Sequence, residues 1–274
     1  MLKNFTIIIL FLFTHSSLAE LKPQSINKYP HGLDSTIYHT LESKELKREF
    51  HLFVKLPKDY KTSNKKYPVI YLLDGGLTYP LLASYHTYLS LAEETPQSII
   101  VGISYGTSDF KKGNRRSTDF TAKAKTRDYW GGAKVFQNFL KEELLPIIEN
   151  TYPADPSRRI IFGQSIGGQF VLYTVLTQPD LFWGHIASNP ALHRNLGFYK
   201  KNHSKVKSSK ARLFVSSGSN DDPKFKKPAG NWIKHWNNLN EKPWALKTEI
   251  LQRQNHFSAA PESFRQGLKW IYEP

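Results

Sequence analysis

The sequence predicts a protein of the α/β class, with a mostly parallel central sheet, an antiparallel N-terminal edge and helices on both faces. From Val69 onward, apolar runs of strand length alternate with segments of helical periodicity, the pattern of parallel βαβ units. The stretch 48–56 instead alternates apolar and polar residues, which is typical of a strand exposed on one side. With 274 residues and no internal repeat or linker, one domain accounts for the chain.

In the N-terminal half, the sequence predicts two edge strands, then two central strands. The uninterrupted apolar run Val69–Leu73 predicts a strand buried on both faces, and it ends in Asp74-Gly75-Gly76. The polar, basic connection 105–129 is long enough to favour a functional role. The expected strands here are 35–41, 48–56, 69–73 and 98–104, and the expected helices are 77–91 and 132–150.

In the C-terminal half, the same alternation continues to the end of the chain. Proline at the start of the last helical segment fits the first turn of a helix, where its missing NH costs nothing. The expected strands are 159–162, 182–187, 212–216 and 244–251. Three helices are expected: one that begins at residue 166, one over 231–239 and one over 261–271.

The pattern Gly163-x-Ser165-x-Gly167 lies between a predicted strand and a predicted helix. The two glycines remove Cβ atoms that would collide at so sharp a turn, which leaves the Ser165 hydroxyl at its crest. The free NH groups and the dipole of the following helix favour the negative oxygen that forms when serine attacks an ester. The alternative is that Ser165 only caps the helix.

A nucleophilic serine needs a base and a carboxylate, which follow it in sheets of this kind in the order acid, then histidine. Of the later histidines, only His256 lies in a loop between a late strand and the final helix, at the edge where Ser165 emerges. We therefore expect His256 to be the base, against the alternative that it caps the last helix. The others are His185, His193, His203 and His235.

Two aspartates follow the strand 212–216 and could supply the acid. Pro223 restricts the backbone of Asp222 to an extended conformation, so Asp221 is favoured as the residue that orients His256. One of the two is expected to form an Asx turn before the proline. The oxyanion should receive the NH of Ile166 and an NH of Gly76 or Leu77.

The N-terminus resembles a secretory signal peptide, residues 1–19, which leaves residues 20–274 as a single domain. Lys3 precedes the apolar run 5–13, and Ser17-Leu-Ala19 supplies the small residues of a cleavage site. The run is too short to span a bilayer, so we expect no membrane span after cleavage, although a retained anchor is the alternative. The absence of cysteine fits a bacterial periplasmic or secreted protein without disulfides.

The formal net charge is +15, and loss of the signal leaves 37 basic and 23 acidic residues. This charge either keeps the surface solvated or attracts an anionic substrate or surface. No nucleic-acid-binding motif accompanies it, and no metal-ligand spacing such as H-E-x-x-H occurs, so we expect neither partner. The basic clusters are Lys200, Lys201, Lys205, Lys207, Lys210 and Arg212, and Lys111, Lys112, Arg115 and Arg116.

Five segments together resemble the "Putative esterase" family of α/β-hydrolases, and within it the branch of the ferric-siderophore esterases. The resemblance covers most of residues 48–272. The segments are Tyr67-Pro-Val-Ile-Tyr-Leu-Leu-Asp-Gly-Gly76, Arg116-Ser-Thr-Asp-Phe-Thr121, the Gly131–Leu140 segment with its paired glycines, Glu143-Leu-x-Pro146 and Gly163-Gln-Ser-Ile-Gly-Gly168.

The resemblance implies the α/β-hydrolase fold and ester hydrolysis without a cofactor, with the catalytic roles on Ser165, His256 and an acid near Asp221. It also implies that Arg115 and Arg116 hold an anionic catecholate substrate. Gln164 departs from the family, where histidine is more usual before the serine. The acidic residue of the triad varies more among members of this branch than the serine and the histidine do. A catalytic Ser-His pair without an acid therefore remains an alternative to the triad.

Other functions on the same fold stay open from the sequence alone. They are a carbohydrate acetyl or feruloyl esterase, an acyltransferase and a non-catalytic binding protein. The sequence does not identify the acyl or alcohol part of a substrate, nor the oligomeric state.

Overall fold

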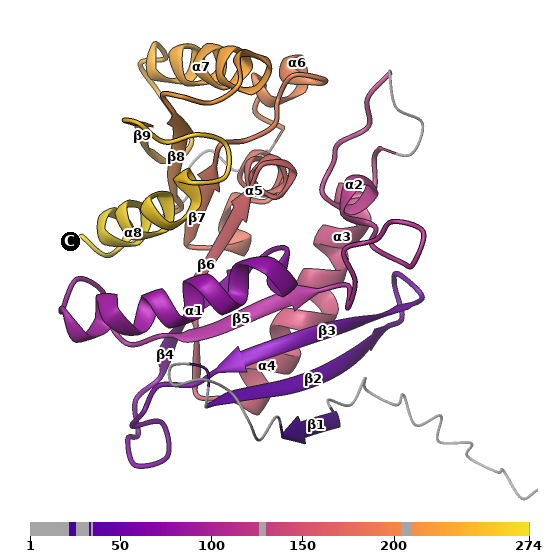
Figure 1. Cartoon of the computed structure of the whole chain (residues 1–274), viewed down its shortest axis with the longest axis vertical. Coiled ribbons are helices and arrows are strands. Elements are labelled where there is room, and N and C mark those ends of the chain that lie inside the picture. Colours follow the sequence, from indigo (N-terminus) through magenta and orange to yellow (C-terminus); the bar gives the residue numbers. More distant parts are fainter. Residues whose placement is uncertain (1–21, 26–32, 34, 126–129, 204–209, 274) are drawn as a thin grey trace, which may run out of the picture.

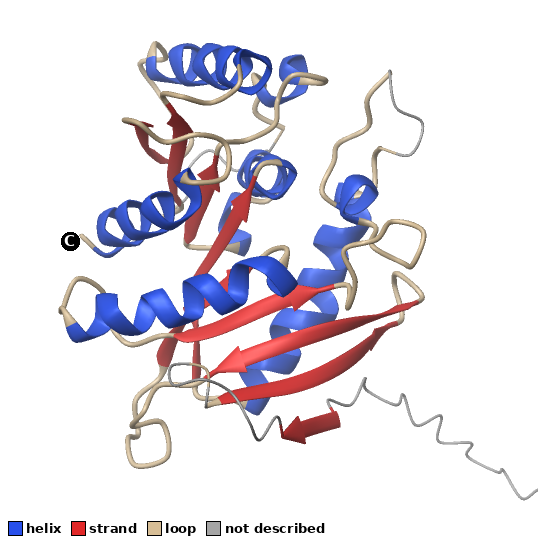
Figure 2. Ribbon diagram, viewed as in Figure 1, coloured by secondary structure: helices blue, strands red, loops and turns tan. Residues whose placement is uncertain are grey.

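The computed structural model describes residues 22–25, 33, 35–125, 130–203 and 210–273. The predicted signal peptide lies outside these residues. One sheet of nine strands runs through the described part of the chain, in the order β1-β2-β3-β5-β4-β6-β7-β8-β9. Figure 1 labels the elements along the chain, and Figure 2 shows helices packed around the sheet.

The sheet is antiparallel at its N-terminal edge and parallel from β5 to β9. β1 pairs antiparallel with β2, β2 with β3, and β3 with β5. Each later neighbour is parallel, which confirms the predicted fold class. The strands are β1 Lys22–Ser25, β2 Thr36–Ser43, β3 Arg48–Lys55, β4 Tyr67–Leu72, β5 Ile99–Ser104, β6 Ala154–Gln164, β7 Gly184–Ser188, β8 Arg212–Gly218 and β9 Ala245–Leu251.

The helices bury two apolar layers, one on each face of the sheet. α1 and α8 cover one face, whereas α3, α4, α5 and α7 cover the other. The helical elements are α1 Gly75–Leu91, α2 Arg116–Asp119, α3 Ala133–Phe139, η1 Leu140–Leu144, α4 Leu145–Thr151, α5 Ile166–Thr177, η2 Pro179–Leu181, α6 Leu196–Tyr199, α7 Pro223–Asn237 and α8 Ala259–Tyr272.

The helix predicted over 132–150 is interrupted by a π-helical turn, η1, between α3 and α4. Pro146 lies two residues after the end of this turn and has no NH to donate to the preceding helical turn, so the hydrogen-bond register changes there. α7 begins at Pro223, eight residues before the predicted start, because the side chain of Asp222 caps it. The short elements β1, α2, η2 and α6 were not predicted.

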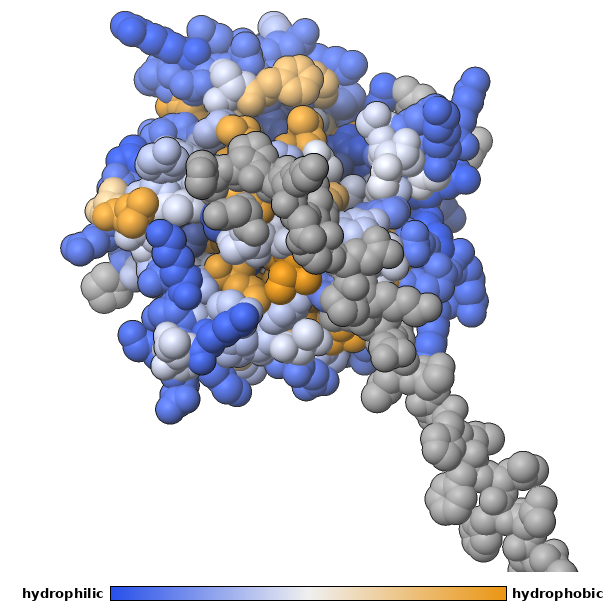
Figure 3. All heavy atoms as spheres, turned by 60° about the horizontal axis from the view of Figure 1, so that its bottom comes forward, coloured by the Kyte–Doolittle hydropathy of each residue, from blue (hydrophilic) through white to orange (hydrophobic). Residues whose placement is uncertain are grey.

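The surface in Figure 3 is mainly hydrophilic, with smaller apolar patches between the polar residues. This agrees with the excess of basic residues in the sequence. Within the described ranges, no helix combines the length and apolar character needed to cross a bilayer.

Phe136 lies at the centre of an aromatic cluster beneath the sheet. It is fully buried, and its ring lies 5.1 to 6.0 Å from the rings of Phe50, Phe120, Phe139 and Phe170. The cluster joins β3, the connection after α2, α3 and α5.

Replacing Phe136 by alanine should lower the free energy of unfolding by about 3–5 kcal/mol, because the cavity cannot be refilled by its rigid ring neighbours. Urea unfolding followed by circular dichroism measures this. Val135→Ala is the matched control, since Val135 is the preceding residue of the same helix and is 39% exposed. A loss for Phe136→Ala no larger than that of the control would contradict this view of the core.

Candidate active site

Ser165 lies at the turn between β6 and α5 in a strained backbone conformation. Its φ of 60° and ψ of −114° are unusual for a residue other than glycine. Backbone hydrogen bonds to a neighbouring segment hold the turn, because Ser165 N donates to Ser188 O at 3.0 Å and Ala191 N donates to Ser165 O at 3.1 Å. The strain therefore lies at the residue whose hydroxyl leaves the sheet edge, as in nucleophile turns.

The glycines around Ser165 allow strand and helix to meet. A Cβ on Gly163 would lie 2.3 Å from the carbonyl carbon and oxygen of Gly167, so no side chain fits there. Gly167 is less constrained than expected, since the nearest atom to its Cβ would be Asp74 Oδ2 at 3.3 Å. The sequence interpretation passed over Gly168, whose Cβ would lie 2.9 Å from Ser188 O.

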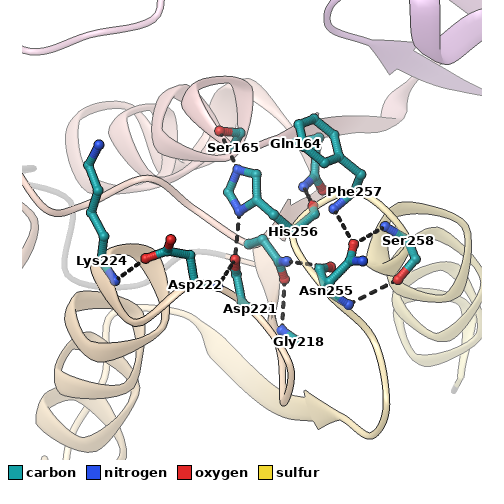
Figure 4. Close-up of polar contacts among 11 residues, drawn as sticks. Gln164, Ser165, Gly218, Asp221, Asp222, Lys224, Asn255, His256, Phe257 and Ser258 are labelled. Atoms are coloured by element: carbon teal, nitrogen blue, oxygen red, sulfur yellow. Dashed lines mark hydrogen bonds and ion pairs between the residues drawn. The ribbon is translucent and has the colours of Figure 1, made fainter.

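Ser165, His256 and Asp221 form one chain of hydrogen bonds (Figure 4). His256 Nε2 lies 2.8 Å from Ser165 Oγ, and His256 Nδ1 lies 3.0 Å from Asp221 Oδ2. The side chain of His256 is 12% exposed and that of Asp221 is 1% exposed. The serine and the carboxylate thus bind opposite nitrogens of one imidazole, the arrangement in which the imidazole can accept the serine proton.

Asp222 has a different task from Asp221. Its carboxylate accepts a hydrogen bond from Lys224 N at 2.7 Å and caps α7, which is the Asx geometry expected for one of the pair. Its own NH donates to Asp221 Oδ1 at 2.7 Å, so it also steadies the carboxylate that contacts His256. Pro223 restricts Asp222 to an extended backbone, with ψ of 133°, and this restriction accounts for the different roles of the two aspartates.

The loop that carries His256 is held by Asn189 and Gly218, which the sequence did not single out, and by Gln164, which stood out only as a departure from the family. Asn189, which follows β7 directly, donates from Nδ2 to Asn255 O at 3.1 Å and accepts the NH of Gly218 at 3.0 Å. Gly218 lets β8 approach this loop, because a Cβ there would lie 2.4 Å from Gln254 O. Gln164 Nε2 donates to the carbonyl of His256. Gln164 therefore positions the loop that carries His256. Its position directly before Ser165 was the one feature in the sequence that pointed to this role.

Two aromatic side chains flank the imidazole of His256. Phe225 of α7 stacks on it with ring centroids 4.2 Å apart and an interplanar angle of 24°. Phe257 meets it edge-on at 5.5 Å and is 78% exposed. The imidazole is thus fixed on one side and bordered by an exposed apolar ring on the other.

The NH groups expected to stabilise an oxyanion lie at the starts of α5 and α1. Ile166 is the first residue of α5 and Gly76 is the second residue of α1, and neither position has a carbonyl partner within its own helix. Leu77 N already donates to Asp74 O at 2.8 Å, which favours Gly76 of the two residues considered. A Cβ built on Gly167 would lie only 3.3 Å from Asp74 Oδ2, so the two helix starts lie close together.

Arg115 and Arg116, both expected to bind substrate, have different surroundings. Arg116 donates from Nε and Nη2 to the two carboxylate oxygens of Asp74, at 2.7 and 2.9 Å. Arg115 is exposed, and its guanidinium carbon lies 4.9 Å from the ring centroid of Phe110. Of the two, Arg115 is the more exposed, whereas the Arg116 side chain is bound to Asp74 and is 28% exposed.

The other histidines that follow Ser165 in the sequence make contacts away from the catalytic residues. Burial in β7 lowers the pKa of His185 to about 3, so this residue is neutral. His203 and His235 lie within 3.0 and 2.9 Å of the backbone carbonyls of Phe198 and Lys200. His193 packs edge-on against Phe225, at 5.2 Å between ring centroids.

A cavity of about 330 Å³ lies at the far end of α1, bordered by Lys55, Leu91 and Ser98. We place the candidate site at Ser165 instead, because the side chains that could react meet there. Within the described ranges, three or more His, Cys, Asp or Glu residues nowhere lie close enough together to hold a metal ion.

The family model described as "Putative esterase" matches residues 43–271. The chain belongs to this family. The match includes all of β3 to β9 and thus every residue of the candidate site.

Several relatives are named for siderophore ester cleavage. The chain is 34% identical over 186 residues to the ferri-bacillibactin esterase BesA of Bacillus subtilis (strain 168), an alignment covering 62% of this chain and 63% of BesA. It is 28% identical over 174 residues to the apo-salmochelin esterase of Escherichia coli O6:H1, covering 58% of this chain and 54% of that protein. The matched regions therefore span about half to two thirds of these relatives.

Solved structures share the fold over nearly the whole chain. The BES protein from Bacillus cereus superposes with a TM-score of 0.76 at 24% identity, covering 92% of this chain and 100% of that one. The siderophore hydrolase EstB from Aspergillus nidulans gives a TM-score of 0.73 at 21% identity, covering 86% and 95%. The expected α/β-hydrolase fold is therefore confirmed.

Proposed function

We propose that this protein is an exported serine esterase that cleaves carboxylic esters, with a ferric siderophore of the catecholate-lactone type as its substrate. The observation that carries the proposal is the hydrogen-bond chain from Ser165 through His256 to Asp221. Membership of the esterase family supports ester hydrolysis, and the named relatives support the siderophore class.

In the proposed mechanism, Ser165 Oγ attacks the ester carbonyl while His256 Nε2 takes its proton. Asp221 holds the other imidazole NH and so stabilises the imidazolium that forms. The NH groups of Ile166 and Gly76 stabilise the oxyanion, and His256 then protonates the leaving alcohol. A water molecule, deprotonated by the same imidazole, attacks the acyl-enzyme, releases the acid and restores Ser165.

Two exposed side chains support an anionic aromatic substrate. The exposed ring of Phe257 offers an apolar contact beside the imidazole, and the exposed guanidinium of Arg115 offers a positive charge. The overall basic charge would also attract an anion from solution. Export is proposed from the signal-like sequence of residues 1–19.

Ser165→Ala should lower kcat for p-nitrophenyl acetate and for a triscatecholate lactone by at least about 10³-fold, since the attacking atom is lost. Ser157→Ala, at the far end of the same strand, is the matched control. Undiminished turnover by Ser165→Ala would exclude Ser165 as the nucleophile. Slower cleavage of the lactone than of feruloyl sugars would reject the siderophore part of the proposal and leave the esterase part intact.

Asp221→Asn should lower kcat by about 10² to 10⁴-fold, because the amide no longer stabilises the imidazolium or fixes the correct tautomer. Asp222→Asn is the matched control, since asparagine caps a helix as well as aspartate does. Steady-state assays with p-nitrophenyl acetate measure both variants. If Asp221→Asn retained a third or more of the activity, a Ser-His pair would suffice and the role of Asp221 would be rejected.

A further inference from the structure

Asp74, the residue before the two glycines of the α1 start, has a left-handed backbone. Its φ of 55° and ψ of 42° lie in the left-handed region, which residues other than glycine adopt rarely, although aspartate and asparagine do so more often than most. This conformation sets the direction of the following peptide groups, including the NH of Gly76. The contacts of the Asp74 side chain can therefore help to hold this conformation.

Arg116 supplies that restraint from a distant part of the chain. Its two hydrogen bonds to the Asp74 carboxylate form a parallel fork, the geometry that fixes a carboxylate most firmly. The side chains of Arg116 and Asp74 are 28% and 16% exposed, so the pair is largely shielded from water. Although burial opposes its charge, Asp74 raises the pKa of the Arg116 guanidinium above its ordinary value.

The helix that carries Arg116 is itself anchored. Asp119, at the other end of α2, accepts hydrogen bonds from Arg48 of β3 at 2.5 Å and from the hydroxyl of Tyr105 at 2.8 Å. Gly132 packs against α2 so closely that a Cβ there would lie 2.9 Å from Thr118 O. The backbone of Arg116 is therefore held in place by these contacts of α2.

The start of α1 leaves little room for adjustment. A Cβ on Gly75 would lie 2.5 Å from the backbone of Gly102, and Thr78 Oγ1 donates to Leu73 O at 2.8 Å. The carbonyl of Asp74 accepts the NH groups of Leu77 and Thr78 at 2.8 and 3.0 Å. A rotation of Asp74 would therefore be transmitted to the Gly76 peptide.

The Asp74 carboxylate also lies beside the first turn of α5. Asp74 Oδ2 would be 3.3 Å from a Cβ on Gly167, one residue after the expected oxyanion donor Ile166. A carboxylate without its partner at this position would oppose the negative charge that develops on the substrate oxygen. The Arg116 guanidinium neutralises it.

We propose that Arg116 is a positioning residue, which directs the Gly76 NH toward the oxyanion through Asp74 and cancels the charge of the Asp74 carboxylate. Arg115, its exposed neighbour, is then the cation available to an anionic substrate. This inference rests on the proposed esterase function and deepens it.

The test uses p-nitrophenyl acetate, whose lack of charge separates positioning from anion binding. Arg116→Gln should lower kcat by about 10 to 100-fold and change KM by less than about threefold, because a displaced oxyanion donor affects the transition state and not the bound ester. Arg265→Gln is the matched control, since Arg265 forms a similar fork with Glu94, at 2.7 Å for both bonds, away from Ser165. Thermal denaturation verifies that each variant is folded.

Two further variants test the parts of the proposal. Arg116→Lys keeps the charge but cannot form the fork, so its kcat should fall at least about threefold and stay above that of Arg116→Gln. Adding Asp74→Asn to Arg116→Gln removes the unpaired carboxylate, and asparagine tolerates the left-handed conformation, so the double variant should regain at least about threefold in kcat.

Unchanged kcat in folded Arg116→Gln, wild-type kcat in Arg116→Lys or no recovery in the double variant would overturn the proposal. A defect that appears only as a higher KM for an anionic ester would assign Arg116 to substrate binding and would overturn it too. Failure of the esterase function itself would be seen separately, as a wild-type protein without activity or an active Ser165→Ala variant.

Discussion

The structure depends on the close contact between β6 and α5, where the backbone of Gly163 packs directly against that of Gly167. No side chain fits between them, so the chain turns sharply and Ser165 adopts a conformation that serine otherwise avoids. The hydrogen bonds of Ser165 N and O to Ser188, at the end of β7, and to Ala191, after it, hold this turn from outside. The parallel sheet then brings the ends of β8 and β9 to the same edge, where Asp221 and His256 meet the hydroxyl.

Much of this arrangement was predictable because it is local in the sequence. The apolar runs gave the central strands, and the glycine spacing gave the turn. The restriction that Pro223 places on Asp222 distinguished the two aspartates, and their contacts in the structure follow that division. The order of residues along the parallel sheet also favoured His256 over the histidine buried in β7.

What the sequence did not predict depends on contacts between distant segments. Arg115 and Arg116 are neighbours with the same side chain, yet one is exposed and the other is bound to Asp74, 42 residues away. Asn189 and Gly218 similarly show their roles only when the loop of His256 lies against them. The early start of α7 depends on the cap that the Asp222 side chain provides, and the spacing of apolar residues does not reveal such a cap.

The central claim is that the hydroxyl of Ser165 is a nucleophile activated by the imidazole 2.8 Å away. Mass spectrometry of peptides from protein treated with an uncharged fluorophosphonate tests it most directly, because such reagents form a covalent bond with activated serines. We expect one phosphonyl adduct, on the peptide that contains Ser165. Folded protein that remains unmodified, or that carries its adduct on another serine, would contradict it.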